Sequence, residues 1–190
     1  NFIMILPITA FGSPVLRKQC VSITADYPSL DSLLVNMWET MYAASGVGLA
    51  APQINKAIRL FLIDTTPFLD DKEEGLEEQV VKKVFINANI IEEKGEEWVF
   101  NEGCLSIPEI REDIIRKPSI TIEYFDEYFK KHIDVFDGLT ARVIQHEYDH
   151  INGILFTDKI SALRKRMIKG KLMDIRKGKV SVNYKMRFFK

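Results

Sequence analysis

The spacing of apolar residues along the chain predicts three helices. Between residues 30 and 42 apolar side chains recur every three or four positions, which is the spacing of a helix with one buried face. A second helix is expected to begin after Asp137 and to end at Gly153, because aspartate is a favoured N-cap and glycine is favoured just beyond a helix end. A third helix is expected over about 159–176.

Short runs of β-branched and aromatic residues predict strands around these helices. The predicted strands are 58–63, 84–86, 98–100, 120–124, 132–136 and 180–186. The segments 120–124 and 132–136 flank a polar turn and are expected to form a hairpin, whereas the acidic stretch 70–79 is expected to be an exposed loop. Because helices and strands do not alternate as βαβ units, we expect an α+β fold, with antiparallel or mixed sheets packed around a central helix.

The composition is that of an ordinary globular protein. The chain has 190 residues, 46% of them hydrophobic and 28% charged. This length and composition are enough for one globular domain over residues 1–190. These values exclude collagen-like, disulfide-rich and disordered chains, and no apolar run is long enough to cross a bilayer. The first residues do not read as a signal peptide, and two cysteines make no disulfide framework, so a cytoplasmic location is expected.

Charge is unevenly distributed along the chain. Residues 164–190 carry 11 Lys or Arg and one acidic residue, a net charge of +10, whereas residues 1–163 have a net charge of −11. The expected C-terminal helix and strand-like tail, about 159–190, therefore form a basic segment on an acidic body. Such asymmetry indicates contact with nucleic acid or with a membrane surface, and the alternative is an ordinary solvated helix face.

The clearest chemical signal is the run His146-Glu147-Tyr148-Asp149-His150 in the second predicted helix. Residues four positions apart lie on one face of a helix, so both imidazoles can reach one metal ion. The intervening Glu147 can then act on a water molecule at that metal. The chain has three histidines, and the remaining one, His132, is interpreted as an ordinary strand residue.

Two histidines leave a catalytic metal without a third protein ligand. No histidine follows His150, and the C-terminal segment has few carboxylates, so the third ligand is expected upstream. The segment Glu102-Gly-Cys-Leu-Ser106 offers the thiol of Cys104, and one thiolate with two imidazoles leaves a coordination position open for catalysis. Cys20 has no comparable context and is interpreted as a buried apolar residue.

A third segment, Gly46-Val-Gly-Leu-Ala-Ala-Pro-Gln53, superficially matches a dinucleotide-binding pattern. That pattern must follow a strand and open a helix, whereas here a predicted helix precedes it. The two glycines are better interpreted as a close backbone approach, with Gln53 supplying an amide side chain.

Taken together, these three segments resemble the peptide deformylase family. That family carries G-x-G-x-A-A-x-Q, E-G-C-x-S and Q-H-E-x-D-H segments in this order, and the chain has them at 46–53, 102–106 and 145–150. The likeness extends from residue 5 to at least residue 156. The predicted strand at 180–186 departs from the helical ending of simple bacterial members.

The resemblance implies removal of the formyl group from the N-terminal formylmethionine of nascent polypeptides, with release of formate. The implied metal ligands are Cys104, His146 and His150, and the implied general base and acid is Glu147. The implied oxyanion donors are the side chain of Gln53 and the backbone N–H of Leu105. The implied substrate-binding residues are Val47, Gly48, Phe100, Arg111, Leu139 and Val143, with His146 also bordering the methionine pocket. Without the resemblance, the residues indicate only a metal-dependent amide hydrolase.

The resemblance also implies a cofactor and partners. Intrinsic affinity for a Cys/His site favours Zn²⁺ over Fe²⁺, but the family implies Fe²⁺, with Ni²⁺, Co²⁺ or Zn²⁺ as substitutes. The expected partners are N-formylmethionyl nascent peptides and the ribosome surface, reached through the basic C-terminal tail. No DNA and no membrane partner is expected.

Two other classes of function fit parts of the pattern. A zinc endopeptidase would need a third His or Glu after the motif and an extended peptide cleft, and neither is apparent. A binding module with a structural metal would have a fourth protein ligand or would lack Glu147.

Overall fold

The computed structural model describes residues 3–69 and 80–189, and the loop expected at 70–79 lies outside these residues. The helices are α1 (Leu30–Ala43), α2 (Gly138–Ile151) and α3 (Ala162–Arg176), with single 3-10 turns η1 (Pro14–Arg17), η2 (Ala51–Ile54), η3 (Thr66–Leu69) and η4 (Phe156–Asp158). The strands are β1 (Ile8–Thr9), β2 (Gly48–Ala50), β3 (Leu60–Asp64), β4 (Lys82–Lys94), β5 (Trp98–Cys104), β6 (Ile107–Arg116), β7 (Ser119–Phe125), β8 (Lys131–Asp137) and β9 (Met186–Arg187).

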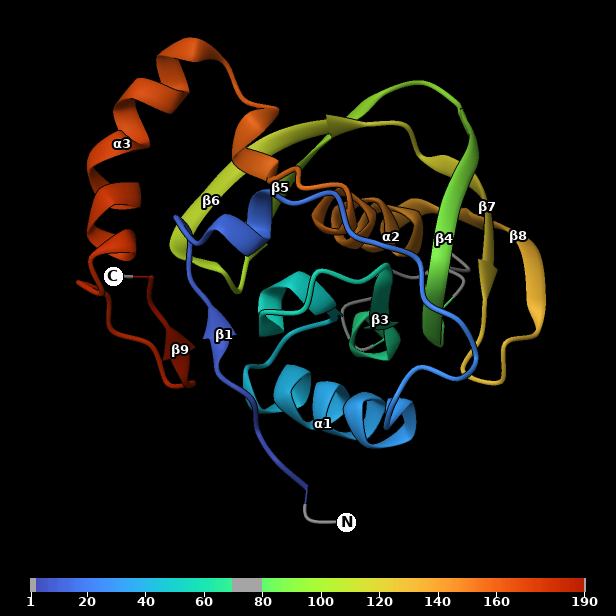
Figure 1. Ribbon diagram of the computed structural model, residues 1–190. Coiled ribbons are helices and arrows are strands. Elements are labelled where there is room, and N and C mark those ends of the chain that lie inside the picture. Colours follow the sequence, from blue (N-terminus) through green and yellow to red (C-terminus); the bar gives the residue numbers. More distant parts are fainter. Residues whose placement is uncertain (1–2, 70–79, 190) are drawn as a thin grey trace.

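Within residues 3–69 and 80–189 the strands form three separate sheets. The largest has five antiparallel strands in the order β2-β3-β4-β7-β8. The β5 and β6 strands form an antiparallel hairpin, and β1 pairs with β9 in parallel. The α+β class expected from the sequence is therefore confirmed, with one small parallel pair that joins the two ends of the chain (Figure 1).

The centre of the large sheet is buried on both faces, and β3 shows why. All five of its residues are buried, and successive side chains point to opposite faces of a strand. Leu60 and Leu62 pack in the cluster that contains α1, whereas Phe61 and Ile63 pack in the cluster that contains α2. A continuous apolar run is therefore what a strand between two helices requires.

Helix α2 lies between the large sheet and the β5-β6 hairpin (Figure 1). Its apolar side chains Ala141, Ile144 and Ile151 pack against the sheet. On its other side, Arg142 donates hydrogen bonds to the backbone carbonyls of Ile114 in β6 and Trp98 in β5. The expected central helix with the H-E-x-x-H motif is thus confirmed, and two sheets hold it in place.

The structure differs from the sequence predictions where strands are polar. Strand β6 was not predicted, because two of its buried positions, Glu112 and Arg116, are charged and one exposed position, Ile115, is apolar, which breaks the alternation expected of a strand. Strand β4 extends well beyond 84–86, and its C-terminal half was not predicted because it is mostly exposed and contains charged residues. The strand predicted at 180–186 is wrong in its bounds, because only Met186 and Arg187 pair with β1.

Within the described residues, no helix combines the length and the apolar character needed to cross a membrane.

The end of α2 is fixed by Gly153, as the sequence predicted. Its φ of +72° is in the left-handed region, and its N–H donates to the carbonyl of His150 at 3.2 Å. The next N–H, of Ile154, donates to the carbonyl of Asp149 at 3.0 Å. This pair of hydrogen bonds is the Schellman ending that glycine favours, and it closes the helix directly after the second histidine of the motif.

We predict that Gly153→Ala lowers the free energy of unfolding by about 1–3 kcal/mol. A Cβ there would lie 2.7 Å from the backbone carbonyl oxygen of Arg17, in addition to the unfavourable φ. The matched control is Gly170→Ala in α3, where a Cβ would meet nothing within 4 Å. That change should raise stability by about 0.5–1 kcal/mol, as alanine does in an exposed helix. Equal effects of both substitutions in urea titrations would contradict this reading of the α2 ending.

Candidate metal centre

Helix α2 brings the two motif histidines together on its buried side. The rings of His146 and His150 have centroids 5.1 Å apart, and His150 is 1% exposed. Their i and i+4 spacing places them one turn apart on the same face, as the sequence predicted. His132, by contrast, lies in β8 with its Nε2 2.7 Å from the carboxylate of Asp126, outside this group.

The thiol of Cys104 completes the group from the end of β5. A register shift between Gly103 and Cys104 interrupts the β5-β6 pairing at the end of the strand. The Cys104 Sγ lies 3.3 Å from Nε2 of His150, and one donor atom each from Cys104, His146 and His150 lie within 4.8 Å of one another. One sulfur and two imidazole nitrogens converging from two elements are a donor set that suits a divalent transition metal.

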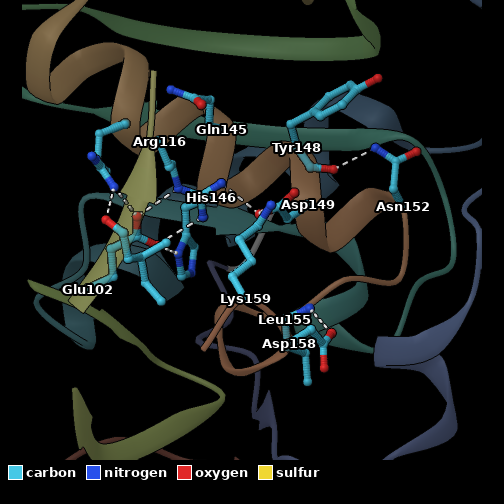
Figure 2. Close-up of polar contacts among 12 residues, drawn as sticks. Glu102, Arg116, Gln145, His146, Tyr148, Asp149, Asn152, Leu155, Asp158 and Lys159 are labelled. Atoms are coloured by element: carbon cyan, nitrogen blue, oxygen red, sulfur yellow. Dashed lines mark hydrogen bonds and ion pairs between the residues drawn. The ribbon is translucent and has the colours of Figure 1, made fainter. Parts of the chain in front are cut away.

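The carboxylate of Glu102 orients His146. Its Oε2 lies 3.0 Å from Nδ1 of His146, so the Nδ1–H donates a hydrogen bond to the ionised Glu102 and the ring presents Nε2 to the thiol. Glu102 also accepts hydrogen bonds from Arg116 at 2.7 and 3.0 Å (Figure 2). A further hydrogen bond comes from Arg142 at 3.0 Å. Burial alone would raise the pKa of Glu102, but hydrogen bonds from His146 and Arg116 hold it well below its usual value.

Asp149 lies between the two histidines in the sequence and extends the ionic network of Glu102 through Arg116. It accepts a hydrogen bond from Arg116 at 2.8 Å and forms an ion pair with Lys159 at 3.3 Å (Figure 2). The guanidinium of Arg116 therefore bridges Glu102 of the hairpin and Asp149 of α2. Sequence reasoning missed Arg116 and Arg142, because an isolated arginine gives no signal until its buried carboxylate partner is known.

The Gly46–Gln53 segment contacts the metal-ligand group from another part of the chain. The side-chain oxygen of Gln53 accepts the N–H of Ala50 at 2.8 Å, which leaves its amide nitrogen 3.6 Å from Cys104 Sγ and 3.3 Å from Ser106 Oγ. A Cβ on Gly48 would lie 2.5 Å from Oε1 of Glu147. The predicted close backbone approach is therefore confirmed, and what approaches the backbone is the motif glutamate.

Glu147 is a buried carboxyl group beside the two histidines. It is 4% exposed, and its Oε2 is one of the buried side-chain atoms without a hydrogen-bond partner among the described residues. Burial raises the pKa of Glu147 to about 7, and the nearby positive charge of His146 opposes this increase. A carboxyl group whose pKa lies near neutrality can both accept and return a proton.

The two histidines differ in protonation. Burial, together with the positive charge on His146, lowers the pKa of His150 well below its usual value, so its imidazole is neutral and ready to bind a metal. Burial would also lower the pKa of His146, but hydrogen bonds to Cys104 and Glu102 raise it well above its usual value. Metal binding at His146 must therefore displace a proton.

A cavity of about 800 Å³ opens beside this group. Of the substrate-binding residues that the resemblance implied, those that line it are Val47, Gly48, Phe100, Arg111 and Val143. Leu139, at the start of α2, is half-buried and is not among the residues that line this cavity. The cavity is also lined by a segment that sequence reasoning did not connect with the site, Ser181 to Tyr184.

The sequence and the structure both match known proteins. The chain is 62% identical to the peptide deformylase of Christiangramia forsetii, over 97% of this chain and 96% of that protein, and 60% identical to that of Flavobacterium johnsoniae, with the same coverage. Among solved structures, the peptide deformylase of Legionella pneumophila has a TM-score of 0.79 at 36% identity and covers 93% of this chain and 98% of its own. That of Ehrlichia chaffeensis, in complex with actinonin, has a TM-score of 0.82 at 27% identity, over 94% of this chain and all of its own.

The family model for polypeptide deformylase matches residues 5–166, which include all three motifs and the whole metal-ligand group. With this match and relatives at about 60% identity over nearly the full length, the chain belongs to the polypeptide deformylase family, the metal-dependent enzymes that remove the N-formyl group from nascent peptides.

Proposed function

We propose that Cys104, His146 and His150 hold the catalytic metal of this deformylase and that Glu147 moves the proton. The observation that carries this assignment is the convergence of three donor atoms within 4.8 Å at the wall of the cavity that Glu147 also lines. Among the described residues the Oε2 of Glu147 has no hydrogen-bond partner, which is consistent with a site that gains a partner when it is occupied.

The metal that we propose is Fe²⁺, with Ni²⁺, Co²⁺ or Zn²⁺ able to substitute. The Cys/His₂ donor set accepts each of these ions, and the choice of iron rests on the resemblance to the family. When bound, such a metal supplies hydroxide at neutral pH, because it lowers the pKa of water from about 15.7 to about 7.

Glu147 serves as general base and then as general acid. Its carboxylate would accept a proton from the water molecule whose oxygen adds to the formyl carbon, and it would return that proton to the amide nitrogen as the bond between the formyl carbon and that nitrogen breaks. The products are formate and a peptide with a free α-amino group. A pKa of about 7 suits both transfers, and the glycine hydrogen at position 48 leaves room for the carboxylate in this position.

Gln53 and the backbone N–H of Leu105 stabilise the oxyanion that forms from the formyl oxygen. The Gln53 oxygen is held by the N–H of Ala50, so its amide nitrogen faces Cys104 and the cavity. A donor in a fixed position of this kind contributes about 2.7–4 kcal/mol to transition-state stability in comparable sites.

The cavity wall supplies the proposed substrate contacts. Val47, Phe100 and Val143 are apolar and suit a methionine side chain, whereas Gly48 allows the substrate backbone to approach β2. Arg111 lies at the rim of the cavity. Its Nε donates to the side-chain oxygen of Asn101 at 2.8 Å, and its Nη2 donates to the backbone carbonyl of Asn101 at 2.5 Å. Leu139 stays a prediction as a further contact.

We further propose that residues 1–190 act as one catalytic unit in the cytoplasm and that the basic C-terminal segment contacts the ribosome. The substrate emerges from the ribosome, whose surface is rich in RNA phosphate, while residues 1–163 have a net charge of −11. Arg164 does not belong to the proposed contact surface, because its guanidinium binds Glu112 at 2.8 and 2.9 Å. The proposed contacts are the exposed residues Arg166, Lys169 and Lys171 on α3.

We predict that Glu147→Gln keeps the metal and loses turnover by about 10²–10⁴-fold, because the amide cannot accept the proton. The matched control is Glu127→Gln, at an exposed position in the turn between β7 and β8. Metal content and the kcat for a formyl-Met peptide are measured for both variants. Normal metal content with activity within a few-fold of the parent would show that another group is the base.

We predict that the iron-loaded enzyme loses activity in air faster than the nickel-loaded enzyme, through oxidation of the Cys104 thiolate. Cys20 provides an internal control, because it is 4% exposed and burial raises its pKa to about 11. Mass spectrometry of aged iron enzyme should find added oxygen at Cys104 and not at Cys20. Equal half-lives for the two metal forms would count against iron and against this route of inactivation.

We predict that changing Arg166, Lys169 and Lys171 to Gln strongly weakens co-sedimentation with ribosomes. Three phosphate contacts correspond to a slope of about −2 to −3 in log affinity against log salt. The control variant changes the exposed residues Lys18, Lys56 and Lys130 to Gln, an equal loss of charge outside α3. If both triple variants bind ribosomes like the parent, or weaken equally, α3 is only a solvated basic helix.

A further inference from the structure

The last residues of the chain return to the active site after α3. Helix α3 ends at Arg176, and the chain then runs back to β1 (Figure 1). There the N–H of Ile8 donates to the carbonyl of Lys185 and the N–H of Ala10 donates to that of Arg187, both at 2.8 Å. Phe188 packs against the cluster that includes the apolar side chains of β6. The match to the polypeptide deformylase family ends at residue 166, so this returning segment lies beyond the matched residues.

The returning segment is attached next to the metal-ligand group. The hydroxyl of Tyr184 donates to the backbone carbonyl of Leu105 at 2.9 Å, one residue beyond Cys104. Residues Ser181, Val182, Asn183 and Tyr184 line the same cavity as Cys104 and Glu147. The segment is therefore a wall of the active-site cavity as well as the partner of β1.

This wall lies at the outer edge of the cavity. Ser181 and Asn183 are exposed, whereas Glu147 and His150 are 4% and 1% exposed. A formyl group that reaches the buried glutamate and histidines must leave the rest of its peptide extending outwards. The residues that follow formylmethionine then meet the exposed part of the lining, which includes Ser181 and Asn183 together with Asn101 and Arg111.

We infer that residues 181–184 form a subsite for the peptide residues that follow formylmethionine and that Tyr184 positions this subsite through its hydrogen bond to Leu105. This inference rests on the proposed function of the metal centre. The hydroxyl of Ser181 and the amide of Asn183 can hydrogen-bond to peptide groups of any sequence, which suits an enzyme whose substrates differ after the first residue. Tyr184 is a positioning residue, because it acts through Leu105 and the tail.

The test compares a short and a longer substrate on the metal-loaded, full-length enzyme. We measure kcat and KM for formyl-Met-amide and for a formyl-Met tripeptide with the parent, with Tyr184→Phe and with the double variant Ser181→Ala/Asn183→Ala. Tyr128→Phe is the matched control, since it removes the same hydroxyl from a side chain that is 84% exposed in the turn between β7 and β8. Melting temperatures are recorded for all four proteins.

The expected result is a loss of preference for the longer substrate. The ratio of kcat/KM for the tripeptide to that for the amide should fall about threefold to tenfold in Tyr184→Phe and in the double variant, mainly through KM. Tyr128→Phe should keep the parent ratio. The double variant changes exposed side chains, so it tests the subsite even where loss of the Tyr184 hydroxyl weakens the fold.

Two results would overturn the inference. One is a ratio within about twofold of the parent in both variants, which is below the effect of a lost hydrogen bond. The other is an equal loss for both substrates with a lower melting temperature, which would make the segment a structural brace. If the parent itself releases no formate from either substrate, the proposed function fails, and this outcome is distinct from a parent that is active and variants that keep its ratio.

Discussion

The buried carboxylate of Glu102 is the interaction on which the rest of the site depends. Glu102 is 5% exposed and lies in the hairpin, yet its oxygens accept hydrogen bonds from His146 and Arg142 of α2 and from Arg116 of β6. A buried negative charge requires such partners, and removing one member of a buried ionic group costs about 3–5 kcal/mol. The same contacts therefore join the hairpin to α2 and fix the orientation of the imidazole that faces Cys104.

Close approach between backbone and side chain is the second constraint. The glycines of the first two motifs lie where a Cβ would meet another side chain: Gly46 against Leu105 at 2.8 Å, Gly48 against Glu147 at 2.5 Å and Gly103 against Arg111 at 2.8 Å. The segment 46–53, the end of β5 and helix α2 therefore pack as one unit around the cavity. The ionic network sets orientation, and the glycines set the distance between elements.

The elements with strong apolar periodicity were predictable from sequence. Helix α1, the β7-β8 hairpin and the bounds of α2 follow from residue spacing and from Gly153. Asp137 stands at the N-cap of α2 as predicted, but among the described residues its side chain makes no capping hydrogen bond. The convergence of Cys104 with the histidines of α2 was also predictable. The H-E-x-x-H spacing supplies two metal ligands, and because no histidine follows the motif, the third ligand had to come from upstream. Strand β6 could not be predicted locally, because its buried face combines isoleucines with Glu112 and Arg116, whose ionic partners only tertiary packing reveals. The path of residues 181–184 was not predictable either. It is set by the residues that follow, because Met186 and Arg187 pair with β1 near the other end of the sequence.

The account assigns the metal to a site built by one thiolate from β5 and two imidazoles from α2. The spectrum of the Co²⁺-loaded enzyme tests this assignment most directly, because a thiolate ligand gives a charge-transfer band that imidazoles alone do not. The account predicts that Cys104→Ala abolishes this band, whereas Cys20→Ala leaves both the band and the bound metal intact. A band that survives Cys104→Ala, or that disappears in Cys20→Ala, would contradict it.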